Sequence, residues 1–162
     1  GFAPNQVSLL PKQTSLYNGL GNIWLEVPKL GLKMPIVGVP MEENIWDVSW
    51  LGDKAGWLDE TAYPTSAGNS VITGHVYLPN GKPGPFVDLK KLSWNDIITI
   101  HVGDKQFIYR VRQAKLVKPD DLTVLKSESS SWITLVTCQG YDEESDSYLY
   151  RQVVRAVLVD TK

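Results

Sequence analysis

The segment Thr-Leu-Val-Thr-Cys, residues 134–138, ends a run of β-forming residues at the only cysteine of the chain. A polar stretch from Gln139 to Ser147 follows, and it leads into a second β-rich run that contains Arg151. A thiol at a strand end beside a loop is placed to attack a substrate, and a hairpin would bring the Arg151 guanidinium close to it. Only the thiolate form of cysteine is a good nucleophile, and a nearby positive charge favours that form. The loop and Arg151 beside Cys138 therefore predict a reactive thiol.

A third candidate residue, His75, ends the apolar run that begins at Val71. An imidazole titrates near neutral pH, so it can take a proton from a thiol and later give one to a leaving amine. The guanidinium of Arg151 stays protonated and can stabilise the oxyanion formed at an attacked carbonyl. With Cys138 they would form a minimal set for thiol-based acyl transfer, which needs no metal.

Each of these residues also has a plain structural interpretation. A lone free cysteine is most often a small buried hydrophobe, so Cys138 alone would favour packing over chemistry. His75 could simply cap a loop. The other histidine, His101, alternates with Thr99 on the more polar face of a predicted strand, which favours a solvent-facing role.

The choice among arginines rests on position alone. Arg151 is preferred because it lies nearest the loop that follows Cys138. Spacing hardly separates it from three other arginines of β-rich runs, which are Arg110, Arg112 and Arg155.

Composition sets the broad class of the protein. The chain has 162 residues and a mass of 18.1 kDa, which suits one domain. Its net charge is −2, so it has no basic field for phosphate backbones, and we expect no nucleic-acid partner. No run approaches the ~20 apolar residues of a membrane helix.

Motifs for other chemistries are missing. There is no Cys-x-x-Cys, no His-Glu-x-x-His, no Gly-x-Ser-x-Gly and no Walker-type loop. The acidic run Asp142–Asp146 lacks the glycine of an EF-hand loop and favours a solvated loop. We therefore expect no metal ligands and no cofactor.

The pattern of the chain indicates an all-β fold of short strands joined by Gly/Pro loops. Residues 96–102 alternate, Gly103-Asp104 predicts a type II′ hairpin turn, and residues 105–114 form the partner strand. Pro35, inside the extended segment 32–39, argues for an edge strand or a bulge. Phe86 to Leu92 is a candidate short helix. These patterns do not choose between a barrel and a sandwich.

The chain resembles the sortase family from about Ile23 to its end. The resemblance lies in Thr-Leu-Val-Thr-Cys with Arg151, in Asn-Ser-Val-Ile-Thr-Gly-His at residues 69–75, in the Gly103 hairpin, and in residues 117–125. It implies a closed eight-stranded β-barrel with short helices or turns in the loops. Residues 1–22 would form an N-terminal arm without a pilin-type lid motif, and residues 23–162 the catalytic barrel.

The resemblance also implies an activity. Cys138 would be the nucleophile, His75 the general acid and base, and Arg151 the oxyanion- or substrate-binding group of a cysteine transpeptidase. Such enzymes cleave a C-terminal Leu-Pro-x-Thr-Gly-like sorting signal between Thr and Gly. They pass the acyl group to an amine of a cell-wall precursor or of a pilin lysine.

Further expectations follow from the same resemblance. Thr137 would lie beside the scissile bond, and Leu122, Val124 and Leu125 would line the groove for the apolar start of the signal. The partners would be surface proteins that carry the signal. The location would be the outer cell surface, through a membrane anchor absent from this chain. The sequence does not indicate Ca²⁺ dependence, because the acidic residues of 41–47 do not reproduce the calcium site of some members.

Two rival interpretations remain at this point. An L,D-transpeptidase-like cell-wall enzyme would also use a thiol, but its Ser-x-Gly-Cys context is missing around Cys138. A non-catalytic surface module could bind carbohydrate through some of the six tryptophans. Thiol reactivity would separate this second alternative from an enzyme.

Overall fold

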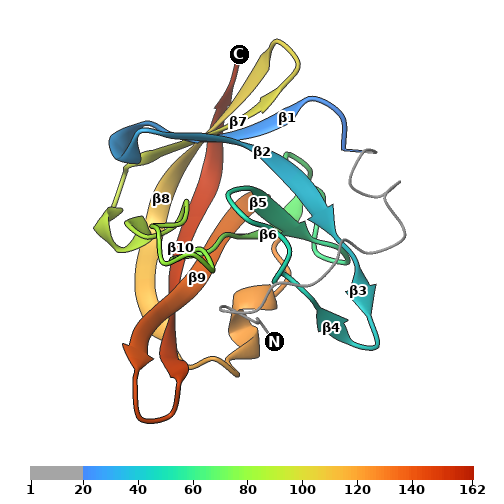
Figure 1. Cartoon of the computed structure of the whole chain (residues 1–162). Helices are drawn as coiled ribbons and strands as arrows, with labels where there is room; N and C mark the ends of the chain where they lie inside the picture. The colour runs from blue at the N-terminus through green and yellow to red at the C-terminus, as the bar shows by residue number, and fades with distance from the viewer. Residues whose placement is uncertain (1–19) are drawn as a thin grey trace.

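The computed structural model describes residues 20–162, whose regular secondary structure consists almost entirely of strands (Figure 1). The predicted N-terminal arm therefore lies largely outside the described residues. The strands are β1 (Ile23–Val27), β2 (Leu32–Val39), β3 (Met41–Glu42), β4 (Ile45–Trp46), β5 (Ala55–Leu58), β6 (Gly68–Thr73), β7 (Ile97–Val102), β8 (Lys105–Val117), β9 (Ser131–Asp142) and β10 (Ser147–Thr161). Three 3₁₀ turns join them: η1 (Pro28–Leu30), η2 (Leu89–Lys91) and η3 (Leu122–Leu125).

Eight of the strands close into a barrel in the order β1-β2-β5-β6-β9-β10-β8-β7. Most neighbours are antiparallel, but β2 with β5 and β6 with β9 run parallel. The short strands β3 and β4 form a separate hairpin. The structure thus confirms the all-β class and selects the closed barrel, which the sequence pattern alone did not distinguish from a sandwich.

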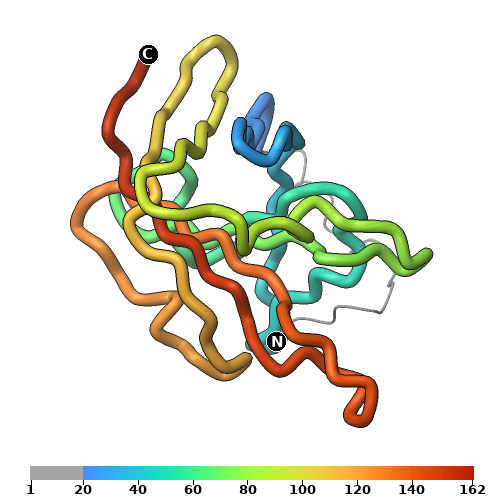
Figure 2. The backbone as a smooth tube through the Cα atoms, turned by 90° about the vertical axis from the view of Figure 1, so that its left-hand side faces the viewer, coloured from blue at the N-terminus to red at the C-terminus, as the bar shows by residue number. Residues whose placement is uncertain are grey.

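The long strands β9 and β10 form a hairpin whose tip extends past the rest of the barrel (Figure 1 and Figure 2). Side chains of a strand alternate between faces, so Ile133 and Leu135 of β9 point into the barrel core with Val154 and Ala156 of β10. The intervening side chains face outward. That outward row of β9 ends at Cys138.

A second apolar cluster lies on this outer face. It contains Val71 of β6, Val136 of β9 and Val153 of β10, and it is covered by Val48 and Leu51 from the segment between β4 and β5. The half-buried side chains that complete it include two residues of η3, Val124 and Leu125. The outer face that carries Cys138 is therefore flanked by two connecting segments, the one between β4 and β5 and the one that contains η3.

Of the local predictions, one hairpin is confirmed and one edge strand is wrong. The β7–β8 hairpin is confirmed: Val102 pairs with Lys105, Gly103 has φ 59°, and Asp104 is not among the positive-φ residues, as a type II′ turn requires. The edge-strand prediction for Pro35 is wrong, since β2 has neighbours on both sides. Pro35 pairs last with β1, and the pairing with β5 begins only at Ile36, so the missing donor falls where one partner replaces the other.

The expected helix at Phe86 to Leu92 is only the single turn η2. Within residues 20–162, none of the helices has the length and apolar character needed to cross a bilayer.

Candidate active site

Cys138 lies near the end of β9 directly opposite Arg151 of β10, because the two residues are register partners in the antiparallel pair. Its side chain is only 6% exposed. Burial raises the pKa of the Cys138 thiol above its ordinary value, and the positive charge of Arg151 partly opposes that rise. The hairpin predicted from the sequence therefore brings the guanidinium and the thiol together.

Arg151 is itself buried, and its Nη1 donates a hydrogen bond of 3.1 Å to the carbonyl oxygen of Tyr150. A cation held in a poorly solvated setting acts on a neighbouring charge more strongly than one in water. The residue is thus positioned to stabilise negative charge that forms beside the sulfur.

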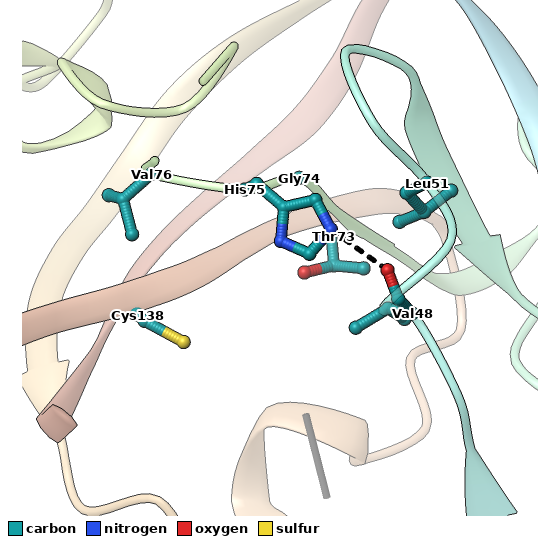
Figure 3. Close-up of a pocket in the computed structure, with 7 residues that line it drawn as sticks. All are labelled: Val48, Leu51, Thr73, Gly74, His75, Val76 and Cys138. Atoms are coloured by element: carbon teal, nitrogen blue, oxygen red, sulfur yellow. Dashed lines mark hydrogen bonds between the residues drawn. The ribbon is translucent and has the colours of Figure 1, made fainter. Parts of the chain in front are cut away.

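His75 follows the end of β6 and is also buried. Its Nε2 lies 2.9 Å from the carbonyl oxygen of Val48. A carbonyl only accepts hydrogen bonds, so Nε2 must carry the proton and Nδ1 is the nitrogen free to exchange one. Nδ1 lies on the side of the ring toward Cys138 (Figure 3). Burial lowers the pKa of His75, and the hydrogen bond to Val48 partly opposes that effect.

One small cavity joins the two residues. Cys138 and His75 line it with five other residues: Val48, Leu51, Thr73, Gly74 and Val76 (Figure 3). Its volume is about 10 Å³, close to the least space that one water needs. Sulfur and imidazole therefore face the same narrow space, which has room for about one water-sized group.

The backbone around His75 is tightly held from two sides. The hydroxyl of Thr137 donates a 2.6 Å hydrogen bond to the carbonyl oxygen of Gly74, and Phe86 N donates one of 3.0 Å to the His75 carbonyl. A Cβ on Gly84 would lie 2.3 Å from that same His75 oxygen, so only glycine fits there. Thr137 is buried and supports the histidine loop. Its predicted contact with substrate remains a prediction.

A separate groove lies beside η3. Leu122, Val124 and Leu125 line it opposite side chains from the barrel and from β4, which are Trp46, Leu58, Val71 and Val136. The groove has a volume of about 80 Å³, and Leu122 is 75% exposed at its rim. The three residues expected in a substrate groove therefore share one apolar depression on the active-site face.

A family model described as the sortase domain matches residues 25–159, which is most of the chain. The chain belongs to the sortase family.

Individual relatives agree with this assignment. This sortase is 26% identical over 156 residues to sortase A of Staphylococcus aureus, a match that covers 93% of this chain and 68% of that protein. It is 26% identical over 138 residues to sortase A of Bacillus anthracis, covering 85% of this chain but only 60% of that relative's length. The crystal structure of sortase C1 from Streptococcus agalactiae superposes with a TM-score of 0.71 at 28% identity, covering 94% and 72% of the two chains.

The competing residues of this sortase lie elsewhere. His101 is in β7, where its Nε2 lies 2.7 Å from Glu26 Oε1, so it is paired and only partly exposed. Arg110 and Arg112 contact Asn95. Arg155 shares the face of Arg151, but it binds Glu128 instead of approaching Cys138. Among the four arginines, Arg151 is the one in register with the cysteine.

Sequence reasoning missed the role of Val48. Any residue supplies a backbone carbonyl, so no residue type could have revealed that this one fixes the imidazole of His75. The turn that presents it also receives a 3.1 Å hydrogen bond from Leu51 N at the same carbonyl, and Asp47 Oδ1 accepts hydrogen bonds from the backbone and hydroxyl of Ser49.

Nitrogen NMR of His75 should reveal its proton and its basicity. We expect the neutral ring to be the Nε2–H tautomer, and its titration midpoint to fall below the ordinary value of 6.5, because burial disfavours the charged imidazolium. The His101→Gln variant, labelled with ¹⁵N-histidine, leaves one imidazole to observe. An Nδ1–H tautomer, or a midpoint above the ordinary value, would contradict this description.

Proposed function

We propose that this chain is the catalytic part of a cysteine transpeptidase that cleaves a Leu-Pro-x-Thr-Gly-like sorting signal between Thr and Gly. Membership of the sortase family supports a transpeptidase that acts on sorting signals. The finer proposal rests on the proximity of a thiol, an imidazole and a guanidinium. Cys138 is in register with Arg151 and shares a cavity with His75.

The first half-reaction forms a thioester. The Cys138 proton passes to Nδ1 of His75, and the sulfur attacks the threonine carbonyl carbon to give a tetrahedral oxyanion. Arg151 stabilises this charge without becoming a proton donor itself. When the C–N bond breaks, the His75 imidazolium returns its proton to the departing glycine amine, so that charge and protons balance.

The second half-reaction reverses these roles. An incoming amine attacks the thioester carbonyl, His75 takes the amine proton, and collapse of the second oxyanion releases the Cys138 thiolate. The thiolate then recovers the proton from His75. These steps use groups of this chain alone, and we propose that the chemistry requires no cofactor.

The free enzyme holds its reacting pair mainly as neutral thiol and neutral imidazole. The pKa of Cys138 is raised and that of His75 is lowered, both chiefly by burial, so the charged pair is the disfavoured form. A substrate that opens the cavity and brings its carbonyl near Arg151 would favour the charged pair. Proton transfer is thus expected to accompany substrate binding.

The groove beside η3 is the proposed site for the apolar start of the signal. Val124 and Leu125 offer an aliphatic lining, and Leu122 stands exposed at the rim. The partners would be surface proteins that carry the signal, with a cell-wall precursor or a pilin lysine as amine acceptor, at the outer cell surface. Family membership disfavours the L,D-transpeptidase rival, and no observation of the site favours the carbohydrate-binding one.

A peptide assay tests this function. A sorting-signal peptide incubated with the protein and triglycine should yield a product in which threonine is joined to triglycine, identified by its mass. Without triglycine, slower hydrolysis to the free threonine acid is expected. A peptide with the same residues in scrambled order is the control. Absence of a joined product across signals varied at their second residue would end the proposal.

A further inference from the structure

The groove wall, which we define as η3 (Leu122–Leu125), is too short to maintain its own shape. Its local support is the side chain of Asp121, whose Oδ1 accepts hydrogen bonds from Thr123 N at 2.8 Å and from Thr123 Oγ1 at 2.6 Å. Single 3₁₀ turns have poor hydrogen-bond geometry and seldom persist without outside contacts. Something else must fix the wall against the barrel.

Asn69 of β6 supplies one such contact. It is 5% exposed, and its amide Nδ2 donates two hydrogen bonds, to the carbonyl oxygen of Val124 at 2.9 Å and to that of Lys126 at 3.0 Å. Its Oδ1 accepts a 2.6 Å hydrogen bond from the hydroxyl of the fully buried Thr134. Both amide protons are used, and a flipped amide would place its oxygen against two carbonyls. The C-terminal end of the groove wall is thus bound in one orientation.

Arg155 of β10 supplies the second contact. It is 7% exposed, its guanidinium carbon lies 4.6 Å from the centre of the Trp132 ring, and its Nη2 lies 2.7 Å from Glu128 Oε1. This ion pair lowers the pKa of Glu128, so the carboxylate stays charged at neutral pH. The segment that follows the groove wall is thereby bound by a buried cation stacked on an aromatic ring.

These contacts form one structure with the catalytic strands. Arg155 is the register partner of Thr134, and both lie on the outward face that carries Arg151 and Cys138 further along the same two strands. We propose that Asn69 and the Arg155–Glu128 ion pair are positioning residues that hold the groove wall ready for the apolar end of the substrate. This inference rests on the proposed function.

A rigid groove wall favours binding because no ordering entropy is lost when the substrate docks. Loosening it should weaken the binding of a large apolar side chain and leave the chemistry at Cys138 intact. For a Leu-first signal peptide, Asn69→Ala should raise KM about tenfold with kcat nearly unchanged, and Glu128→Gln should raise it severalfold. For the matching Ala-first peptide, the change should be small.

Lys126→Gln is the matched control. Its Nζ lies 3.4 Å from the same Glu128 oxygen, but the side chain is 58% exposed, so its loss should change neither peptide's kinetics. Equal KM changes for both peptides, or a fall in kcat at constant KM, would overturn the proposal. Either result would indicate general destabilisation or a direct role in chemistry.

Hydrogen exchange separates this inference from the proposed function. Backbone amides of residues 122–128 should exchange faster in Asn69→Ala and Glu128→Gln than in the wild type, and at the wild-type rate in Lys126→Gln. If the wild type turns over neither peptide, the function fails, but the exchange measurement still decides whether these residues hold the groove wall. Unchanged exchange in both variants would overturn the positioning role.

Discussion

Replacement of Cys138 by alanine is expected to lower kcat for peptide joining by at least about 10⁴-fold, because no other group can form the thioester. The serine variant should be nearly as inactive, since its hydroxyl needs a far stronger base than His75 to become an anion. The measurement is the initial rate of triglycine-joined product, followed by mass spectrometry at saturating peptide.

The Cys138→Ala protein also provides its own control. The substitution removes one buried atom and leaves the contacts of Thr137 and His75 in place, so the fold should persist with unchanged circular dichroism. It should still bind the Leu-first peptide, since the groove beside η3 is separate from the sulfur. Wild-type rates of joining in this variant would refute thiol catalysis.

Neutral replacement of Arg151, as Arg151→Met, is expected to reduce kcat by about 10²–10³-fold, the usual cost of removing one oxyanion-stabilising group. Methionine retains much of the aliphatic bulk, so packing beside β9 should survive. Arg151→Lys is the matched control. It restores the positive charge without the planar fork and should recover only part of the rate. A full rate in Arg151→Met would remove this residue from the mechanism.

The same variant should change the thiol itself. The charge of Arg151 lowers the pKa of Cys138, so its loss should raise that pKa further. Alkylation of Cys138 by iodoacetamide, measured against pH, should therefore rise at higher pH in Arg151→Met than in the wild type. The lysine variant should lie between the two.

Local strand patterns were predictable where one face of a strand is buried and the turn chemistry is distinctive. The alternation over Ile97–Val102 and the glycine at the turn were sufficient to place the β7–β8 hairpin. Closure into a barrel was not predictable from pattern, because it depends on the parallel pairings of β2 with β5 and of β6 with β9, which join segments distant in the chain. The edge-strand prediction at Pro35 failed for the same reason. Pairing of β2 with β1 ends at Pro35, and its parallel pairing with β5 begins at Ile36, which the sequence pattern does not show.

The candidate site was predictable to the extent that chemistry depends on residue type. A thiol, an imidazole and a guanidinium can be recognised in a sequence, and one hairpin fixes the pairing of Cys138 with Arg151. Arg155 shows the limit of prediction from residue type. The pairing register of β9 with β10 places Arg151 opposite Cys138 and Arg155 opposite Thr134, where Arg155 binds Glu128 instead. The carbonyl of Val48 gives no sequence signal at all.

The outward row on β9 also bears on how far a bound peptide must reach. Val136 lines the groove beside η3, and Cys138 is two residues further along the same face of β9. A strand rises about 3.3 Å per residue, so about 7 Å separates the two along β9. An extended peptide advances by nearly the same amount per residue. We therefore propose that the apolar side chain held in the groove lies only a few residues before the bond that is cut.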